Sequence, residues 1–163
     1  MTKREIERKF LVTSLADVLD GQGETDYLTS SPVEQGYIVE SPEFVLRVRR
    51  FDDDGYLTIK GPKEGEGCDE IEHEIPLKYA LLLLARCTAT IKKTRYLVNF
   101  DMRMWEIDEF LNPELNGLIV AEIELEYEGQ EIMLPPWVTT EVTSDHSYAN
   151  SSLVKRLTCQ KTG

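Results

Sequence analysis

The segment Glu5-Ile6-Glu7-Arg8-Lys9-Phe10-Leu11 is the stretch from which the fold of this chain is best argued. In an extended strand, alternate side chains point to opposite faces, so one face of this segment carries Glu5, Glu7 and Lys9. Two carboxylates and an ammonium group side by side are unfavourable in a core, but they suit a site that holds a metal ion and an anion. Taken alone, the pattern also fits an ordinary solvated strand face.

The same alternation of charge returns along the chain, and the charged face of each later segment is either basic or acidic. The basic faces carry Arg47 with Arg49, Lys60, and Lys93 with Arg95; the acidic faces carry Glu70, Glu72 and Glu74, and Glu122 with Glu124. The opposite faces of these segments are mostly apolar, with residues such as Val48, Ile71 and Ile123. This repetition indicates several strands that contribute to one charged surface.

Segments with a period of two, separated by Gly, Pro, Asp and Asn clusters, predict antiparallel strands. The expected strands are residues 5–12, 34–39, 44–51, 55–60, 70–75, 91–100, 102–110 and 118–127. Residues 51–56 and 100–102 look like hairpin connections, the first with an Asp-Gly turn. Short helices are expected at 14–19 with Ser14 as the N-cap, at 77–86 after Pro76, and at 148–156.

Eight strands in 163 residues favour one domain over residues 1–163, a mainly β protein built as a closed eight-stranded antiparallel β-barrel with a few short peripheral helices. A β-sandwich is the alternative. In a barrel the apolar faces need cover from helices or from a partner subunit, which leaves the charged faces pointing inward. A homodimer is one way to supply that cover.

An interior lined by both signs of charge is stable only if it stays wet or binds ions, because an unpaired buried charge costs several kcal/mol. Arginine and lysine suit phosphate oxygens, and clustered glutamates suit hard cations such as Mg²⁺ or Mn²⁺. Phosphate and metal in one cavity fit phosphoryl transfer. The chain has no GxxxxGK[ST] or GxGxxG loop, so side chains must hold any triphosphate.

Bulk composition narrows the function classes. The formal net charge of −12 argues against a general nucleic-acid-binding surface, which needs a basic face. No apolar run approaches the roughly 18 to 20 residues of a membrane span, and no apolar segment for export follows the N-terminus. Cys68, Cys87 and Cys159 have no metal-binding or redox spacing and are read as free thiols, so a cytoplasmic location is expected.

These residues resemble a known family. The segment from Glu5 to Lys9 is similar to the ExExK signature of the CYTH superfamily, the triphosphate tunnel metalloenzymes. The likeness continues in order through residues 35–37, 47–49, 57–60, 70–76, 93–96, 105–108, 121–125 and 141–143. The resemblance covers nearly the whole chain and implies an eight-stranded antiparallel tunnel, in agreement with the strand count.

The resemblance also implies roles for individual residues. It assigns metal binding to Glu5, Glu7, Glu122 and Glu124, with Glu72 or Glu74 assisting. It assigns triphosphate binding to Lys9, Arg47, Arg49, Lys60, Lys93 and Arg95. The expected catalytic set is Glu5, Glu7, Lys9, Glu122 and Glu124, with Mg²⁺ or Mn²⁺ as the cofactor.

Compact bacterial members that look most like this chain are inorganic tripolyphosphatases, so the expected reaction is hydrolysis of a small anion, triphosphate, to diphosphate and phosphate. The alternatives are a nucleoside or thiamine triphosphatase, a class IV-like adenylate cyclase, or a non-catalytic polyphosphate-binding module. One position departs from the pattern: where similar members usually read Asp-Pro-Arg-Tyr, Ser147 replaces the arginine. Compensation by Lys155 or Arg156 from the C-terminal helix is one consequence, and an altered or weakened activity is the alternative. His73 and His146 are expected to be non-catalytic.

Overall fold

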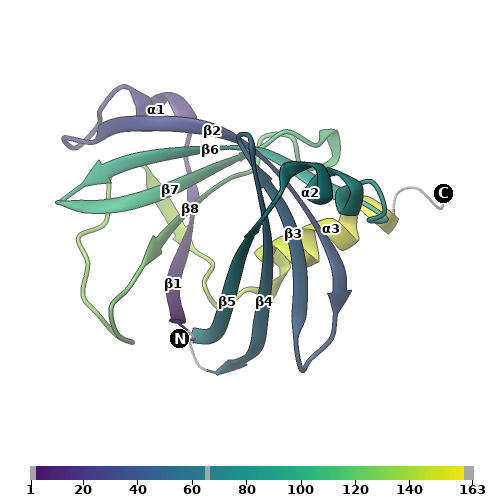
Figure 1. Cartoon of the computed structure of the whole chain (residues 1–163). Helices are drawn as coiled ribbons and strands as arrows, with labels where there is room; N and C mark the ends of the chain where they lie inside the picture. Colours follow the sequence, from purple (N-terminus) through teal and green to yellow (C-terminus); the bar gives the residue numbers. More distant parts are fainter. Residues whose placement is uncertain (1–2, 65–66, 160–163) are drawn as a thin grey trace.

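In the computed structural model, which describes residues 3–64 and 67–159, antiparallel strands form one sheet that curls until its first and fifth strands meet (Figure 1). The strands are β1 (Lys3–Val12), β2 (Asp26–Glu40), β3 (Val45–Phe51), β4 (Asp54–Glu64), β5 (Gly67–Ile75), β6 (Thr90–Phe100), β7 (Arg103–Phe110), β8 (Ile119–Glu124) and β9 (Val138–Glu141). The helices are α1 (Leu15–Leu19), α2 (Leu77–Leu84) and α3 (Asn150–Cys159), with short 3₁₀ turns η1 (Pro113–Leu115) and η2 (His146–Tyr148).

Strands β1 to β8 close the barrel, and this confirms the expected fold. The order around it is β5-β4-β3-β2-β6-β7-β8-β1, and β1 returns to β5 with Glu5 opposite Cys68. The rest of that edge of β1 pairs with the additional strand β9, at Phe10 and Val12. The short polar sequence Val-Thr-Thr-Glu of β9 carries no clear period-two signal, which is why the sequence did not predict it.

Tight turns set the hairpin registers, and one of them is not where it was expected. Asp101 and Met102 both have positive φ, 52° and 56°, as a two-residue hairpin turn between β6 and β7 requires. In the β3–β4 hairpin the turn lies at Asp52, which has a φ of 51°. Gly55, the glycine of the predicted Asp-Gly turn, lies inside β4, where it pairs with Arg50. Gly55 is needed there because a Cβ atom would lie 2.7 Å from the Cβ of Ala80 in α2.

Several strand boundaries also differ from the sequence prediction, including those of β2, β4, β5 and β8. β2 begins at Asp26 rather than at residue 34, and β8 ends at Glu124 rather than at 127. The first half of β2 contains Asp26 and Pro32, which are residue types depleted in strands, but β6 pairs with it from Asp26 to Gly36. Long-range pairing therefore decides the extent of this strand.

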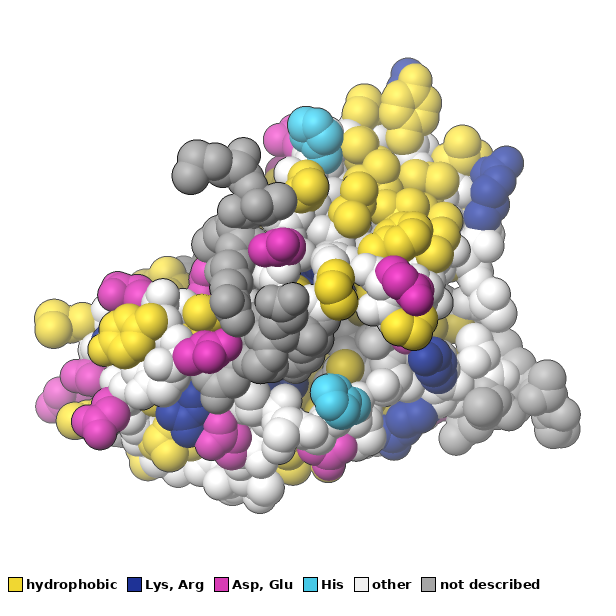
Figure 2. Space-filling view, turned by 90° about the horizontal axis from the view of Figure 1, so that it is seen from below, with side chains coloured by type: hydrophobic (Ala, Val, Ile, Leu, Met, Phe, Trp, Pro, Cys, Tyr) yellow, Lys and Arg dark blue, Asp and Glu magenta, His cyan; other side chains and the backbone are white. Residues whose placement is uncertain are grey.

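The outward faces of the barrel are covered unevenly. Over β1, β6, β7 and β8, the segment that carries Trp137 packs on Trp105 at 5.5 Å between ring centroids, and both tryptophans are fully buried. Helix α2 covers Val48 with Ala80 and Leu84. Ile59 and Ile71 stay 44% and 49% exposed. Figure 2 shows apolar side chains gathered at the upper right of the face that it presents. The expected homodimer stays a prediction.

Helix α3 closes one end of the barrel interior. Its apolar side chains Leu153, Val154 and Leu157 pack with Ile91, Phe110 and Val120, which belong to the inward-facing rows of β6, β7 and β8. The interior is therefore apolar beneath α3 and charged beyond it. None of the helices within the described ranges is long and apolar enough to cross a membrane.

Candidate active site

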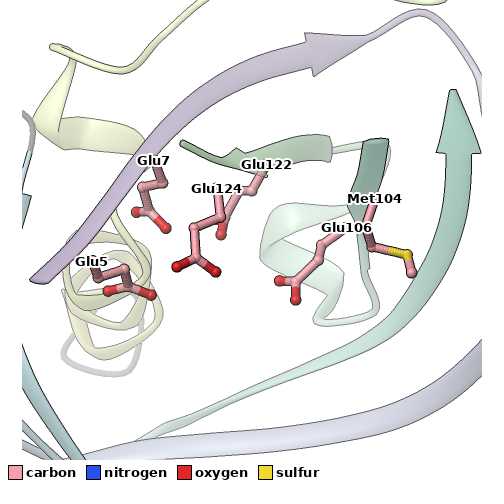
Figure 3. A pocket seen from close by; sticks show the side chains of 6 residues that line it. All are labelled: Glu5, Glu7, Met104, Glu106, Glu122 and Glu124. Carbon is pink, nitrogen blue, oxygen red and sulfur yellow. The ribbon is translucent and has the colours of Figure 1, made fainter. Parts of the chain in front are cut away.

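One wall of the charged interior consists of glutamates from three neighbouring strands. Glu5 and Glu7 lie on β1, Glu106 on β7, and Glu122 and Glu124 on β8. In the strand registers Glu7 faces Glu124 and Glu106 faces Glu122, and side chains of paired residues on one face lie next to each other. With Met104, these glutamates line a cavity of about 120 Å³ (Figure 3).

The basic side chains come from β3, β4 and β6, with Lys9 from β1. A second cavity, of about 140 Å³, lies next to the first and shares Glu7 with it. Its lining includes Lys9, Tyr37, Arg47 and Lys60. Both signs of charge therefore border one connected interior.

The two lysines nearest the glutamates are held by carboxylates. Lys9 Nζ lies 3.1 Å from Glu122 Oε1 and 3.7 Å from Glu7 Oε1. Lys60 contacts Glu5 and lies 2.9 Å from Glu70 Oε2. Each ammonium group is thus shared between two carboxylates, which neutralise its charge.

The arginines of β3 share the carboxylate of Glu72 on β5. Arg49 Nη2 donates to both carboxylate oxygens at 3.1 Å, and Arg47 Nη2 lies 3.7 Å from one of them. Thr58 donates to Glu72 at 2.8 Å and accepts from Arg47 at 3.1 Å. Glu72, predicted to assist in metal binding, serves here as the partner of two arginines.

A fully buried ion cluster lies between β6 and β7. The carboxylate of Asp108 accepts two hydrogen bonds from Arg95, at 2.7 and 2.8 Å, and contacts Lys93. The side chains of Lys93 and Asp108 are each 1% exposed. Burial opposes ionisation of Asp108, but the charges of Arg95 and Lys93 outweigh it and hold the pKa of Asp108 well below its usual range.

Two donors in this interior have no partner among the described residues. The Nε atoms of Arg47 and Arg49 are buried, and neither makes a hydrogen bond there. An unsatisfied buried N–H is costly, about 1 to 3 kcal/mol, and more on a charged group. Arg47 lines the cavity of about 140 Å³, and an anionic oxygen there would satisfy its Nε donor.

The glutamates repel one another. The charge of Glu122, followed by burial, raises the pKa of Glu7 from its ordinary value to about 7. A carboxylate kept partly protonated by a neighbouring carboxylate gains from a cation between them. Within the described ranges, however, no three acidic, imidazole or thiol groups lie close enough together to hold a metal ion. Glu122 and Glu5 form ion pairs with Lys9 and Lys60 instead.

Most of the predicted site residues are brought together, and two are not. Glu74 is exposed and lines none of the cavities described above. Lys155 points away from the interior, since it pairs with Glu40 at 2.8 Å and its side chain is 66% exposed. The ion pair anchors α3 to β2, so the expectation that Lys155 replaces the missing arginine has no geometric support.

Several further groups line or contact this interior, although the sequence alone assigned them no role in the site. They are Tyr37, Thr58, Glu70, Glu106, Asp108 and His146. The alternation Trp105-Glu106-Ile107-Asp108 carried the signal for two of them, because it has the same period as the segment from Glu5 to Lys9. His73 is exposed on β5, and its expected non-catalytic character stays a prediction. Cys68 and Cys87 are free thiols, while the side chain of Cys159 lies outside the description.

Comparison with known proteins places this architecture in a family. Residues 3–157 match the model of the CYTH domain. The chain belongs to the CYTH domain family.

Two relatives of this CYTH protein carry an assigned activity. An inorganic triphosphatase of Acetivibrio thermocellus is 40% identical to it over 154 residues, which cover 93% of this chain and 94% of the relative. The crystal structure of another inorganic triphosphatase superposes with a TM-score of 0.65 at 30% identity and covers 92% and 93% of the two chains. A Pyrococcus furiosus protein, at 24% identity and a TM-score of 0.59 over 77% and 80% of the chains, shares the fold.

Proposed function

We propose that this CYTH protein hydrolyses inorganic triphosphate to diphosphate and phosphate, with a divalent cation as cofactor. The observation that supports the proposal most is the paired arrangement of charge, with a five-glutamate wall bordering a basic interior in which the Nε atoms of Arg47 and Arg49 lack acceptors. The names of its relatives from A. thermocellus and from the crystal structure supply the substrate.

In this proposal the basic side chains bind the triphosphate. Arg47 and Arg49 offer guanidinium N–H groups that match phosphate oxygens, and Lys9 and Lys60 act as point charges once their glutamates are released. Arg95 and Lys93 are held in place by Asp108, so their contribution is a fixed positive field deeper in the barrel. The ligand lies in a cavity that α3 closes at one end, which restricts water.

The glutamate wall fits a hard cation. Oxygen donors are what Mg²⁺ and Mn²⁺ prefer, and the mutual repulsion of Glu7 and Glu122 falls when positive charge lies between them. Glu5, Glu7, Glu122 and Glu124 would hold the ion, and the position of Glu106 in the same cavity adds a fifth carboxylate. A bound ion would neutralise phosphate charge and orient the attacking water.

Phosphate release from tripolyphosphate, ATP and thiamine triphosphate, each with Mg²⁺, Mn²⁺ or EDTA, tests the proposal. We expect turnover of tripolyphosphate with either metal, none in EDTA, and slower release from the two organic substrates. A cyclic product from ATP, preference for an organic triphosphate, or failure to turn over any substrate would contradict it. The free thiols Cys68 and Cys87 fit a reducing compartment, and we place the enzyme in the cytoplasm.

A further inference from the structure

His146 lies at a position that the proposed function has not used. Its side chain lines two cavities that meet at the mouth of the charged interior. The smaller, of about 70 Å³, also includes Lys9 and Thr143, and the larger, of about 290 Å³, includes Glu5 and Lys60. The histidine therefore stands where the interior opens to solvent.

The local turn holds His146 there and leaves its ring free. The carboxylate of Asp145 accepts from the backbone N–H of Ser147 at 3.0 Å and from its hydroxyl at 2.7 Å, so this neighbouring acid is committed to the turn. The carbonyl of His146 accepts from Ala149 N at 3.1 Å, just before α3 begins. Among the described residues, nothing makes a hydrogen bond or an ion pair with the imidazole, although its backbone is fixed.

The mouth needs a donor for an incoming polyanion. Glu5 and Glu7 line it with negative charge, while Lys9 and Lys60 are each already shared between two carboxylates. His146 adds to these two linings an imidazole that makes no hydrogen bond or ion pair with any described residue, although the neighbouring carboxylate of Asp145 interacts with it electrostatically. An imidazole keeps at least one N–H donor in its neutral form, so the contact does not depend on its protonation.

We propose that His146 is a substrate-binding residue. It donates a hydrogen bond to the outermost phosphate of the triphosphate at the mouth of the barrel and thereby positions the substrate. The inference rests on the proposed function for the identity of the substrate. It assigns a role in affinity rather than in the chemical step, because His146 shares its cavities with Lys9 and Lys60 and does not line the cavity where all five glutamates meet.

His146→Ala tests this role, with His73→Ala as the matched control, since His73 is exposed on the outside of β5. For tripolyphosphate we expect KM to rise about tenfold and kcat to stay within about twofold, the size of one hydrogen bond to a charged group. His73→Ala should change neither constant. His146→Gln, which restores an N–H donor, should recover part of the affinity.

A binding measurement separates this inference from the proposed function. Calorimetric titration of each variant with tripolyphosphate in EDTA should show the same tenfold loss for His146→Ala, whether or not the wild type turns the substrate over. An unchanged KM and an unchanged dissociation constant would overturn the role of His146 alone, and an inactive wild type would overturn the proposed function alone. A higher half-saturating Mg²⁺ concentration with unchanged substrate affinity would make His146 a metal ligand and would also overturn it.

Discussion

Replacing Asp108 with asparagine removes a negative charge that both Lys93 and Arg95 contact inside the barrel. Breaking a buried ion pair by removing one partner costs about 3 to 5 kcal/mol, because the remaining charge is left without compensation. Asparagine keeps one acceptor oxygen, and Arg95 still contacts Glu106, so the lower end of that range applies. We expect Asp108→Asn to lower the free energy of unfolding by about 3 kcal/mol, or the melting temperature by about 6 to 12 °C for a chain of this size.

Urea denaturation followed by tryptophan fluorescence measures this loss, since Trp105 and Trp137 are both buried. Asp53→Asn is the control, because the Asp53 side chain is 94% exposed and its contact with Arg50 is 3.7 Å long. That substitution should change the free energy of unfolding by less than about 0.5 kcal/mol. A loss below about 1 kcal/mol for Asp108→Asn would refute the reasoning that the cluster is buried and interdependent.

The pH dependence gives a second check on the same cluster. The pKa of Asp108 is lower in the folded chain than in the unfolded one, so its stabilising effect is present above the unfolded value of about 3.9 and is lost as the pH falls through the folded value. The gap in stability between the wild type and Asp108→Asn should therefore be full at pH 7 and narrow below about pH 4. An equal difference in stability between the two proteins at pH 7 and below about pH 4 would show that the charge of Asp108 is not the cause. Tripolyphosphate should also narrow the gap at pH 7, because a bound polyanion restores negative charge near Lys93 and Arg95.

Further predictions concern the glutamate wall, the packing of α2 and the role of α3. Glu122→Gln should reduce metal-dependent phosphate release at least about a hundredfold with an unchanged circular dichroism spectrum, and wild-type turnover would remove this residue from the metal site. Gly55→Ala should destabilise the chain by about 2 kcal/mol in urea, because its Cβ would lie 2.8 Å from a backbone carbonyl oxygen, whereas Gly61→Ala has 3.6 Å of room and should be close to neutral. Lys155→Ala should leave the KM for tripolyphosphate within about twofold and lower the free energy of unfolding by less than about 1 kcal/mol. Arg47→Ala, by contrast, should raise the KM more than about tenfold. Equal KM values for the two variants would contradict the geometry.

The architecture was accessible from the sequence wherever the period of two was regular. The segment from Glu5 to Lys9 and the later charged segments gave the strand identities, the inward face and both signs of charge at that face. Ser14 was placed correctly as the cap of α1, where its side chain accepts from Asp17 N at 3.1 Å. These features depend on neighbours in the chain, and local alternation is enough to read them.

The partners of each charge were decided only by the closed barrel. Alternation showed that Glu72 faces inward, but not that the register of β3, β4 and β5 would bring it to Arg49 rather than to the glutamate wall. The sequence likewise placed Lys155 in the C-terminal helix, but it did not show that Glu40 would draw the side chain outward. Which inward charges meet depends on strand order and shear, and these are set by contacts between residues far apart in the sequence.

His146 illustrates the same division. The sequence places it in a polar loop with no periodic neighbours, so nothing local distinguishes it from a solvated surface histidine. The chain fold brings that loop from the far end of the sequence to the first strand, beside Glu7 and Lys9. The local alternation of side chains thus determined which residues form strands and which face is charged. Which residues line the mouth of the barrel was decided by its closure, because only closure brings distant segments within reach of one ligand.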